Sequence, residues 1–165
     1  MSQLKLLENK VIDEKILLHG SGQQFHELRP TKRINDGAVS VCATQFPEIA
    51  VLMAILRKCK GKGGIKYKNI TTLINPFLHL KLSQEKLDSL LSTNDLTGYV
   101  YLLNRDNFQR HSLNELRSSD SRFVRSPIVI TKADLPFVPE EGKREYHIPL
   151  SMDIVTSFPI REYFF

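Results

Sequence analysis

Leu17-Leu18-His19-Gly20-Ser21-Gly22 is the stretch from which the fold of this chain can be worked outward. Its apolar run predicts a strand over Lys15–Leu18 that ends at the polar residues. Glycine lets another group approach the main chain closely, so the turn would bring an imidazole, an open backbone and a hydroxyl to one point. We therefore expect a candidate site at the end of this strand.

A second strand followed by a helix comes about twenty residues later. Val39–Ala43 has strand composition, and Pro47 suits the first turn of a helix. Thr44 lies just upstream, where its hydroxyl can accept backbone amides, and Glu48 is favourable near the positive end of the helix dipole. Apolar residues continue at helical spacing to Leu56, so a helix is expected over Pro47–Leu56.

The rest of the chain mixes strands and helices without regular alternation. We expect an amphipathic helix or a peripheral arm in residues 1–14, and a helix capped by Ser83. Further strands are expected at Gly98–Leu103, Phe123–Ile130 and Tyr146–Leu150, with one more within Thr71–Leu80. Two to three helices with several strands predict an α+β domain on a small mixed or largely antiparallel sheet.

Length and composition favour one globular domain spanning residues 1–165. The chain has 165 residues, of which 41% are hydrophobic and 25% charged, enough to bury a sizeable core. An apolar run of membrane-spanning length and a signal-peptide core are both missing, so we expect a cytoplasmic protein without a membrane partner. The sequence leaves the oligomeric state open.

Several common site classes are not supported. The two cysteines and five histidines show no metal-ligand spacing, so no metal is expected. The nucleophile elbow of serine hydrolases, the P-loop and the glycine-rich dinucleotide fingerprint are also missing.

Positive charge is concentrated in residues 57–68. The chain carries 23 Lys and Arg against 18 Asp and Glu, a formal charge of +5. A glycine-interrupted segment holds six of these cations: Arg57, Lys58, Lys60, Lys62, Lys66 and Lys68. They are candidate nucleic-acid-binding residues, because ammonium groups and exposed glycine amides bind phosphates. A solvated connection between two elements is the alternative interpretation.

The order of the two early motifs resembles the ADP-ribosyltransferase-like superfamily. The resemblance rests on His19-Gly20-Ser21 and on Val41-Cys42-Ala43-Thr44 leading into a helix, and it implies a small split-sheet domain that binds NAD as cofactor. By this resemblance His19 would bind a ribose, Gly20 would hold the nicotinamide amide and Ser21 would be a neighbouring polar contact. Ala43 and Thr44 would line the second wall.

The late part of the resemblance departs from the family. Transferases of the diphtheria-toxin and poly-ADP-ribose-polymerase types have a tyrosine in the second motif and a late-strand glutamate, which stabilises the positive charge that develops on the ribose. Here the late strand offers Arg125-Ser126-Pro127, so His19 and Ser126 are the candidate catalytic residues. Glu115, Glu140 and Glu141 are the remaining carboxylate candidates, each in a polar segment whose simplest role is solvation. RNA 2'-phosphotransferases resemble the chain in having no such glutamate.

Two function classes follow. The first is an NAD-dependent transferase that passes ADP-ribose to a nucleic acid or protein acceptor. The second is a non-catalytic interaction domain that binds an anionic partner through residues 57–68. For the first class we expect a pocket that joins His19 to Thr44 and Ser126, which requires His19 and Thr44 to lie on the same face of the sheet.

Overall fold

The computed structural model describes residues 2–32, 36–61, 66–68 and 73–163. Its helices are α1 (Gln3–Glu14), α2 (Pro47–Leu56), α3 (Gln84–Ser92) and α4 (Met152–Ser157), with 3-10 turns at Lys132–Asp134 and Ile160–Tyr163. Its strands are β1 (Leu17–Ser21), β2 (Glu27–Leu28), β3 (Thr31–Lys32), β4 (Val39–Ala43), β5 (Lys66–Lys68), β6 (Phe77–Lys81), β7 (Thr97–Leu103), β8 (Gln109–Arg110), β9 (Leu116–Ser118), β10 (Arg122–Phe123), β11 (Ile128–Thr131) and β12 (Glu145–Pro149).

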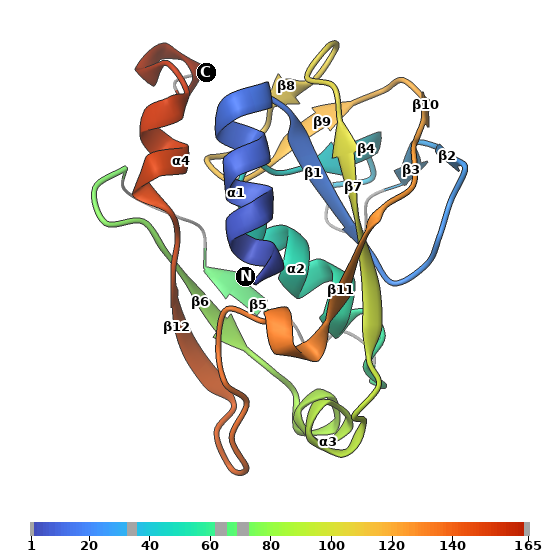
Figure 1. Ribbon diagram of the computed structural model, residues 1–165, viewed down its shortest axis with the longest axis vertical. Coiled ribbons are helices and arrows are strands. Elements are labelled where there is room, and N and C mark those ends of the chain that lie inside the picture. The colour runs from blue at the N-terminus through green and yellow to red at the C-terminus, as the bar shows by residue number, and fades with distance from the viewer. Residues whose placement is uncertain (1, 33–35, 62–65, 69–72, 164–165) are drawn as a thin grey trace.

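The strands form small antiparallel sheets. The orders are β1-β7-β11, β3-β4-β9-β8, β12-β6-β5 and the pair β10-β2. Figure 1 shows β12 and β6 on one side of the molecule and the sheets of β1 and β4 on the other. The expectation of an α+β domain with a largely antiparallel sheet is confirmed. The described residues contain four α-helices rather than two to three, because α1 and the short α4 both form.

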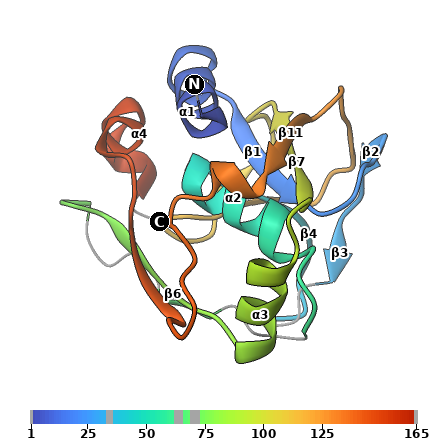
Figure 2. The same cartoon turned by 60° about the horizontal axis from the view of Figure 1, so that its bottom comes forward.

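Helix α2 is the centre of the core and lies between the sheets (Figure 2). Eight of its residues are buried, and it packs on both β1 and β7. Its close approach to the sheet depends on two glycines. A Cβ at Gly20 would overlap the carbonyl oxygen of Ala50, and a Cβ at Gly98 would overlap that of Ala54. These strand positions therefore need glycine for packing.

The N-terminal segment forms a helix that belongs to the core. Leu7 and Val11 of α1 are fully buried, and the helix packs on α2 and α4 (Figure 1). Its apolar residues recur at helical spacing, so burying one face stabilises the helix. Gln3–Glu14 thus forms a helix that packs against the core.

Local sequence signals predicted most of the element boundaries, and the structure corrects the bounds of two predicted strands. Strand β4 and helix α2 have the bounds predicted, and the Ser83 hydroxyl accepts the Lys86 amide at the start of α3. Strand β1 continues through Ser21, so the His-Gly-Ser triplet lies inside the strand and not in a turn after it. The continuous strand expected over Phe123–Ile130 is interrupted before Ile128, where Pro127 cannot donate to a ladder.

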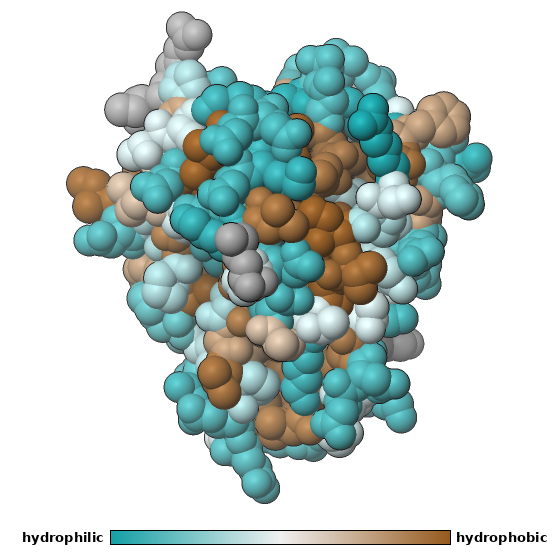
Figure 3. Space-filling view, viewed as in Figure 1, coloured by the Kyte–Doolittle hydropathy of each residue, from teal (hydrophilic) through white to brown (hydrophobic). Residues whose placement is uncertain are grey.

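Polar side chains cover most of the face shown in Figure 3, and apolar surface gathers beside α1, where β7 and β11 run. None of the helices within the described ranges is long and apolar enough to cross a membrane.

Candidate functional site

The sheets of β1 and β4 are joined by a bridge and then separate. Leu18 and Thr44 exchange two backbone hydrogen bonds of 2.8 Å each. Regular antiparallel pairing past this bridge would place Gly20 opposite Cys42. The named strands do not continue that pairing, because β4 pairs with β9 and β1 pairs with β7. The result is a split between two sheets at the His-Gly-Ser triplet.

The imidazole of His19 spans this split. Its Nδ1 lies 2.6 Å from the carbonyl oxygen of Cys42, which belongs to β4. A carbonyl oxygen can only accept a hydrogen bond, so Nδ1 carries the proton. In the neutral imidazole Nε2 is then a hydrogen-bond acceptor, a group suited to a hydroxyl. The Cys42 carbonyl therefore fixes both the orientation and the tautomer of His19.

The backbone of Gly20 points toward the same split. The amide and carbonyl of Leu18 bond to Thr44, and backbone groups along a strand alternate in direction. Gly20, two residues later, thus directs its amide and carbonyl away from β7 and toward the gap that β4 leaves. One donor and one acceptor at adjacent positions match the two polar groups of a carboxamide.

Thr44 lies on the other face from His19, which corrects its expected role. Residues directly opposite in an antiparallel bridge share a face, so the Thr44 side chain lies on the side of Leu18. Its Oγ1 accepts the amide of Phe46 at 3.1 Å, and the side chain is buried. Thr44 is committed to the start of α2. Its neighbour Ala43, also buried, alternates to the opposite face of β4.

Ser21 and Ser126 line two different pockets. A pocket of about 430 Å³ is lined by Ser21, Gly22, Gln23, Phe25, Arg57 and Lys58. A second pocket of about 500 Å³ is lined by Gln24, Phe25, His26, Val124, Arg125, Ser126 and Pro127. Phe25 belongs to both, and His19 and Thr44 line neither. Contrary to the expectation, neither of these two pockets therefore joins His19, Thr44 and Ser126.

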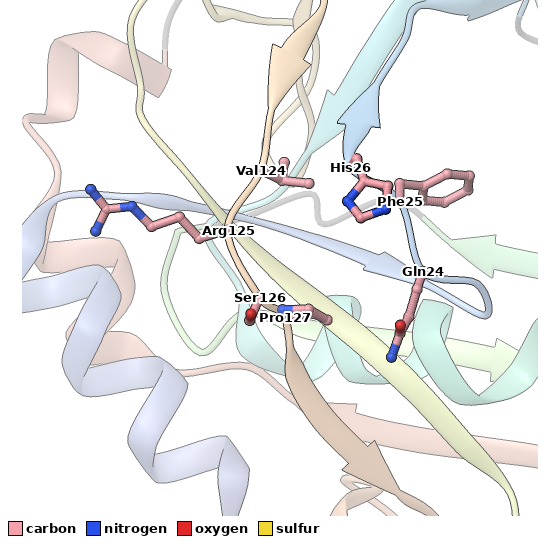
Figure 4. A pocket seen from close by; sticks show the side chains of 7 residues that line it. All are labelled: Gln24, Phe25, His26, Val124, Arg125, Ser126 and Pro127. Atoms are coloured by element: carbon pink, nitrogen blue, oxygen red, sulfur yellow. The ribbon is translucent and has the colours of Figure 1, made fainter.

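The close-up of the second pocket shows why it is a poor anion site. His26 and Val124 face each other across it, whereas the guanidinium of Arg125 and the ring of Phe25 point away on opposite sides (Figure 4). The guanidinium of Arg125, which precedes Ser126 in the sequence, is thus directed out of the pocket.

Tyr101 is a site residue that sequence reasoning missed. It lies directly opposite His19 in β7, and the two ring centroids are 6.5 Å apart. Its hydroxyl accepts the amide of Phe25 at 2.5 Å and reaches the carbonyl of Gln23 at 3.4 Å. Burial raises the pKa of the Tyr101 hydroxyl. Tyr101 thereby ties the segment after β1 to the sheet, and alternation along β7 was the signal that could have marked it.

The basic segment is divided between two places. Arg57 and Lys58, at the end of α2, line the pocket with Ser21. Lys60 is exposed, and its amide donates to the Ser89 hydroxyl of α3. Lys66 is an exposed residue of β5, and Lys68 ends that strand. Lys62 lies outside the described residues.

The alternative carboxylates do not gather at the split. Glu115 binds Arg117, with Oε1 3.3 Å from Nε. Glu140 and Glu141 lie in the turn before β12, which belongs to another sheet. In the part of the chain that the structure describes, no group of three metal-ligating side chains is present, and Cys42 and Cys59 do not form a disulfide.

Comparisons of the chain with protein-family models, curated proteins and solved structures find no match.

Proposed function

We propose that this chain is an NAD-binding domain of the ADP-ribosyltransferase-like type, which transfers ADP-ribose to a nucleic acid or protein acceptor. The observation that supports it is the split between β1 and β4, spanned by the 2.6 Å contact of His19 Nδ1 with the Cys42 carbonyl. His19 then offers a nitrogen that can accept a hydrogen bond from a hydroxyl. The next residue, Gly20, offers a backbone amide and carbonyl that can bind a carboxamide. These are the polar groups that a nicotinamide riboside requires.

The residues at the split fit the cofactor in part. His19 would accept a ribose hydroxyl through Nε2, and Gly20 would bind the carboxamide through its backbone. Ser21 is buried beside them, and its position on β1 puts its side chain on the same face as His19. NAD bound there would supply an ADP-ribosyl group on a good leaving group. Thr44 is not part of this set, because its side chain lies on the other face. The shared face that the NAD hypothesis requires of His19 and Thr44 is therefore missing, and the proposal rests on His19, Gly20 and Ser21 without Thr44.

A non-catalytic interaction domain is the second candidate. The observation that favours it is that the carboxylates weighed from the sequence lie elsewhere or are ion-paired. Without a carboxylate, the positive charge that develops as nicotinamide leaves has no counter-charge from this chain's residues at the split. In this case the basic segment would bind an anionic partner.

Calorimetry with NAD and an assay for released nicotinamide separate the candidates. NAD binding by the native chain, weakened about tenfold in His19→Ala, is expected from the loss of one hydrogen bond of about 1.4 kcal/mol. His147→Ala is the matched control, since that histidine is exposed on β12. Binding with nicotinamide release supports a transferase, and binding alone supports a degenerate pocket. An absence of binding at millimolar NAD would overturn the NAD proposal.

A further inference from the structure

The pocket formed by Ser21, Gly22, Gln23, Phe25, Arg57 and Lys58 is here called the Ser21 pocket. It joins the end of β1 to the end of α2, two elements more than thirty residues apart in the sequence. Two cations, one hydroxyl and one aromatic ring line it, and the described residues of its lining include no carboxylate. The cations and the hydroxyl suit an anion, and the aromatic ring suits a flat ring attached to that anion.

The two cations are not required to cap α2. The ammonium of Lys86, which is buried, lies 3.1 Å from the carbonyl oxygen of Leu56 and 3.4 Å from that of Cys59. Lys86 therefore satisfies carbonyls at the end of the helix. Within the described ranges, no ion pair joins Arg57 or Lys58 to a carboxylate. Their charges remain available to a ligand.

The position of Lys58 is set by packing. A Cβ at Gly22 would lie 3.0 Å from Cδ and 3.2 Å from Cγ of Lys58, so the lysine stem rests on the glycine. The backbone of Gly22 does not adopt a positive φ, and steric contact with Lys58 is thus the specific reason to have glycine there. Glycine at this position keeps the ammonium over the pocket.

A buried hydroxyl completes the polar set. Ser21 is 8% exposed, and its Oγ accepts the amide of Gln23 at 3.1 Å. This contact uses the oxygen as an acceptor and leaves the hydroxyl hydrogen able to donate to a phosphate oxygen. Phe25 is 40% exposed, so one face of its ring can stack on a base.

We propose that the Ser21 pocket binds a phosphate group of a single-stranded nucleic acid, with the adjacent base stacked on Phe25. Lys60 and Lys66 are further exposed cations that follow Arg57 and Lys58 in the sequence, and a chain with several such cations suits a polyanion better than a compact nucleotide. This inference names the acceptor class of the proposed function. Binding is measured without NAD, so failure here is distinguishable from failure of the NAD site.

The test is fluorescence anisotropy with a short labelled oligothymidylate over a range of salt. Replacing both cations, Arg57→Gln with Lys58→Gln, removes two phosphate contacts, and the salt slope should fall by about 1.4, roughly 0.7 for each contact on a single strand. Lys5→Gln with Lys81→Gln is the control, because it removes the same number of charges from exposed lysines that do not line the pocket. Phe25→Ala should weaken binding by roughly tenfold or more, through lost stacking.

Gly22→Ala keeps every charge and only displaces Lys58, so weaker binding in this variant supports a built pocket. The proposal is overturned if Lys5→Gln with Lys81→Gln weakens binding as much as the double replacement of Arg57 and Lys58, or if a duplex of the same length binds as tightly. It is also overturned if adenosine monophosphate competes as well as the oligonucleotide, because the pocket is then a small-nucleotide site. Thermal unfolding of each variant separates lost binding from lost folding, and His19→Ala should bind the strand normally.

Discussion

The Cα of Gly20 packs on the carbonyl oxygen of Ala50, so strand β1 and helix α2 meet backbone to backbone. Gly98 makes the same kind of contact with Ala54, one turn along the helix. The two glycines let the strands approach the helix backbone closely at the two alanines. One face of β1, that of Gly20, therefore packs against the helix. The opposite face, that of His19, belongs to the candidate site.

Gly20→Ala should destabilise the protein by about 3 kcal/mol or more, at the upper end of overpacking costs, because the helix backbone cannot move away as a flexible side chain can. Chemical denaturation measures the free energy of unfolding. Gly22→Ala is the matched control, since its Cβ would crowd the flexible Lys58 side chain and would lie at an ordinary contact distance of 3.8 Å from the Arg57 backbone. Equal stability losses in the two variants would contradict the close packing of α2 on β1.

The second prediction concerns Lys86. Lys86→Met removes a buried ammonium that bonds the Leu56 and Cys59 carbonyls, and should cost about 1 to 2 kcal/mol, because buried acceptors lose their partner. The double replacement of Arg57 and Lys58 by glutamine should leave the unfolding free energy within about 0.5 kcal/mol of the native value. If the double variant were the less stable one, those cations would be helix caps rather than ligand groups.

The third prediction concerns Tyr163, which anchors the C-terminal segment. Its hydroxyl accepts from Gln45 Nε2 at 2.6 Å and donates to the Val155 carbonyl at 3.0 Å, and Arg110 stacks on its ring. Tyr163→Phe leaves buried groups unpaired and should cost about 2 kcal/mol. Urea denaturation measures the loss, and Tyr99→Phe, in a half-buried tyrosine of β7, is the control. A smaller loss at Tyr163 than at Tyr99 would contradict this anchoring role.

Local patterns were enough to predict the central elements. The composition of Val39–Ala43 and the apolar spacing of Pro47–Leu56 depend on near neighbours in the sequence, and both elements have the predicted bounds. The need for glycine at position 20 was attributed to ligand approach. The structure attributes it to a helix thirty residues away, which no local pattern reveals.

The candidate site was harder to predict, because it depends on strand pairing between distant segments. Thr44 was placed with His19, but the bridge to Leu18 puts it on the opposite face, and a shift of one residue in register reverses every side chain. Pairing of β1 with β7 brings Tyr101 beside His19. Packing of α2 brings Lys58 to Gly22, and neither contact follows from spacing along the chain.

The last prediction concerns the carboxyl group of Glu48, in the first turn of α2. Its Oε2 is buried and has no hydrogen-bond partner among the described residues. The pKa of Glu48 is raised from 4.5 to about 7, mainly by burial and in smaller part by the nearby carboxylate of Glu8 on α1. Hydrogen bonds from its own amide and that of Ser151 oppose the increase in pKa.

Because the folded pKa is above the unfolded one, the folded state binds this proton more tightly. The stability contributed by protonation is complete below about pH 4.5 and is lost as the pH rises to 7. At about 1.36 kcal/mol per pKa unit, the loss is of order 3 kcal/mol.

Glu48→Gln should remove this decline and make the protein more stable than native at pH 8, with little difference at pH 4.5. Urea denaturation at both values measures it. Glu8→Gln is the control, because it removes the neighbouring charge but keeps the buried carboxyl, and should restore only part of the stability at pH 8. An equal pH dependence in native and Glu48→Gln proteins would show that water reaches the carboxyl, and that the contact of α1 and α2 is more open than the packing of Leu7 and Val11 indicates.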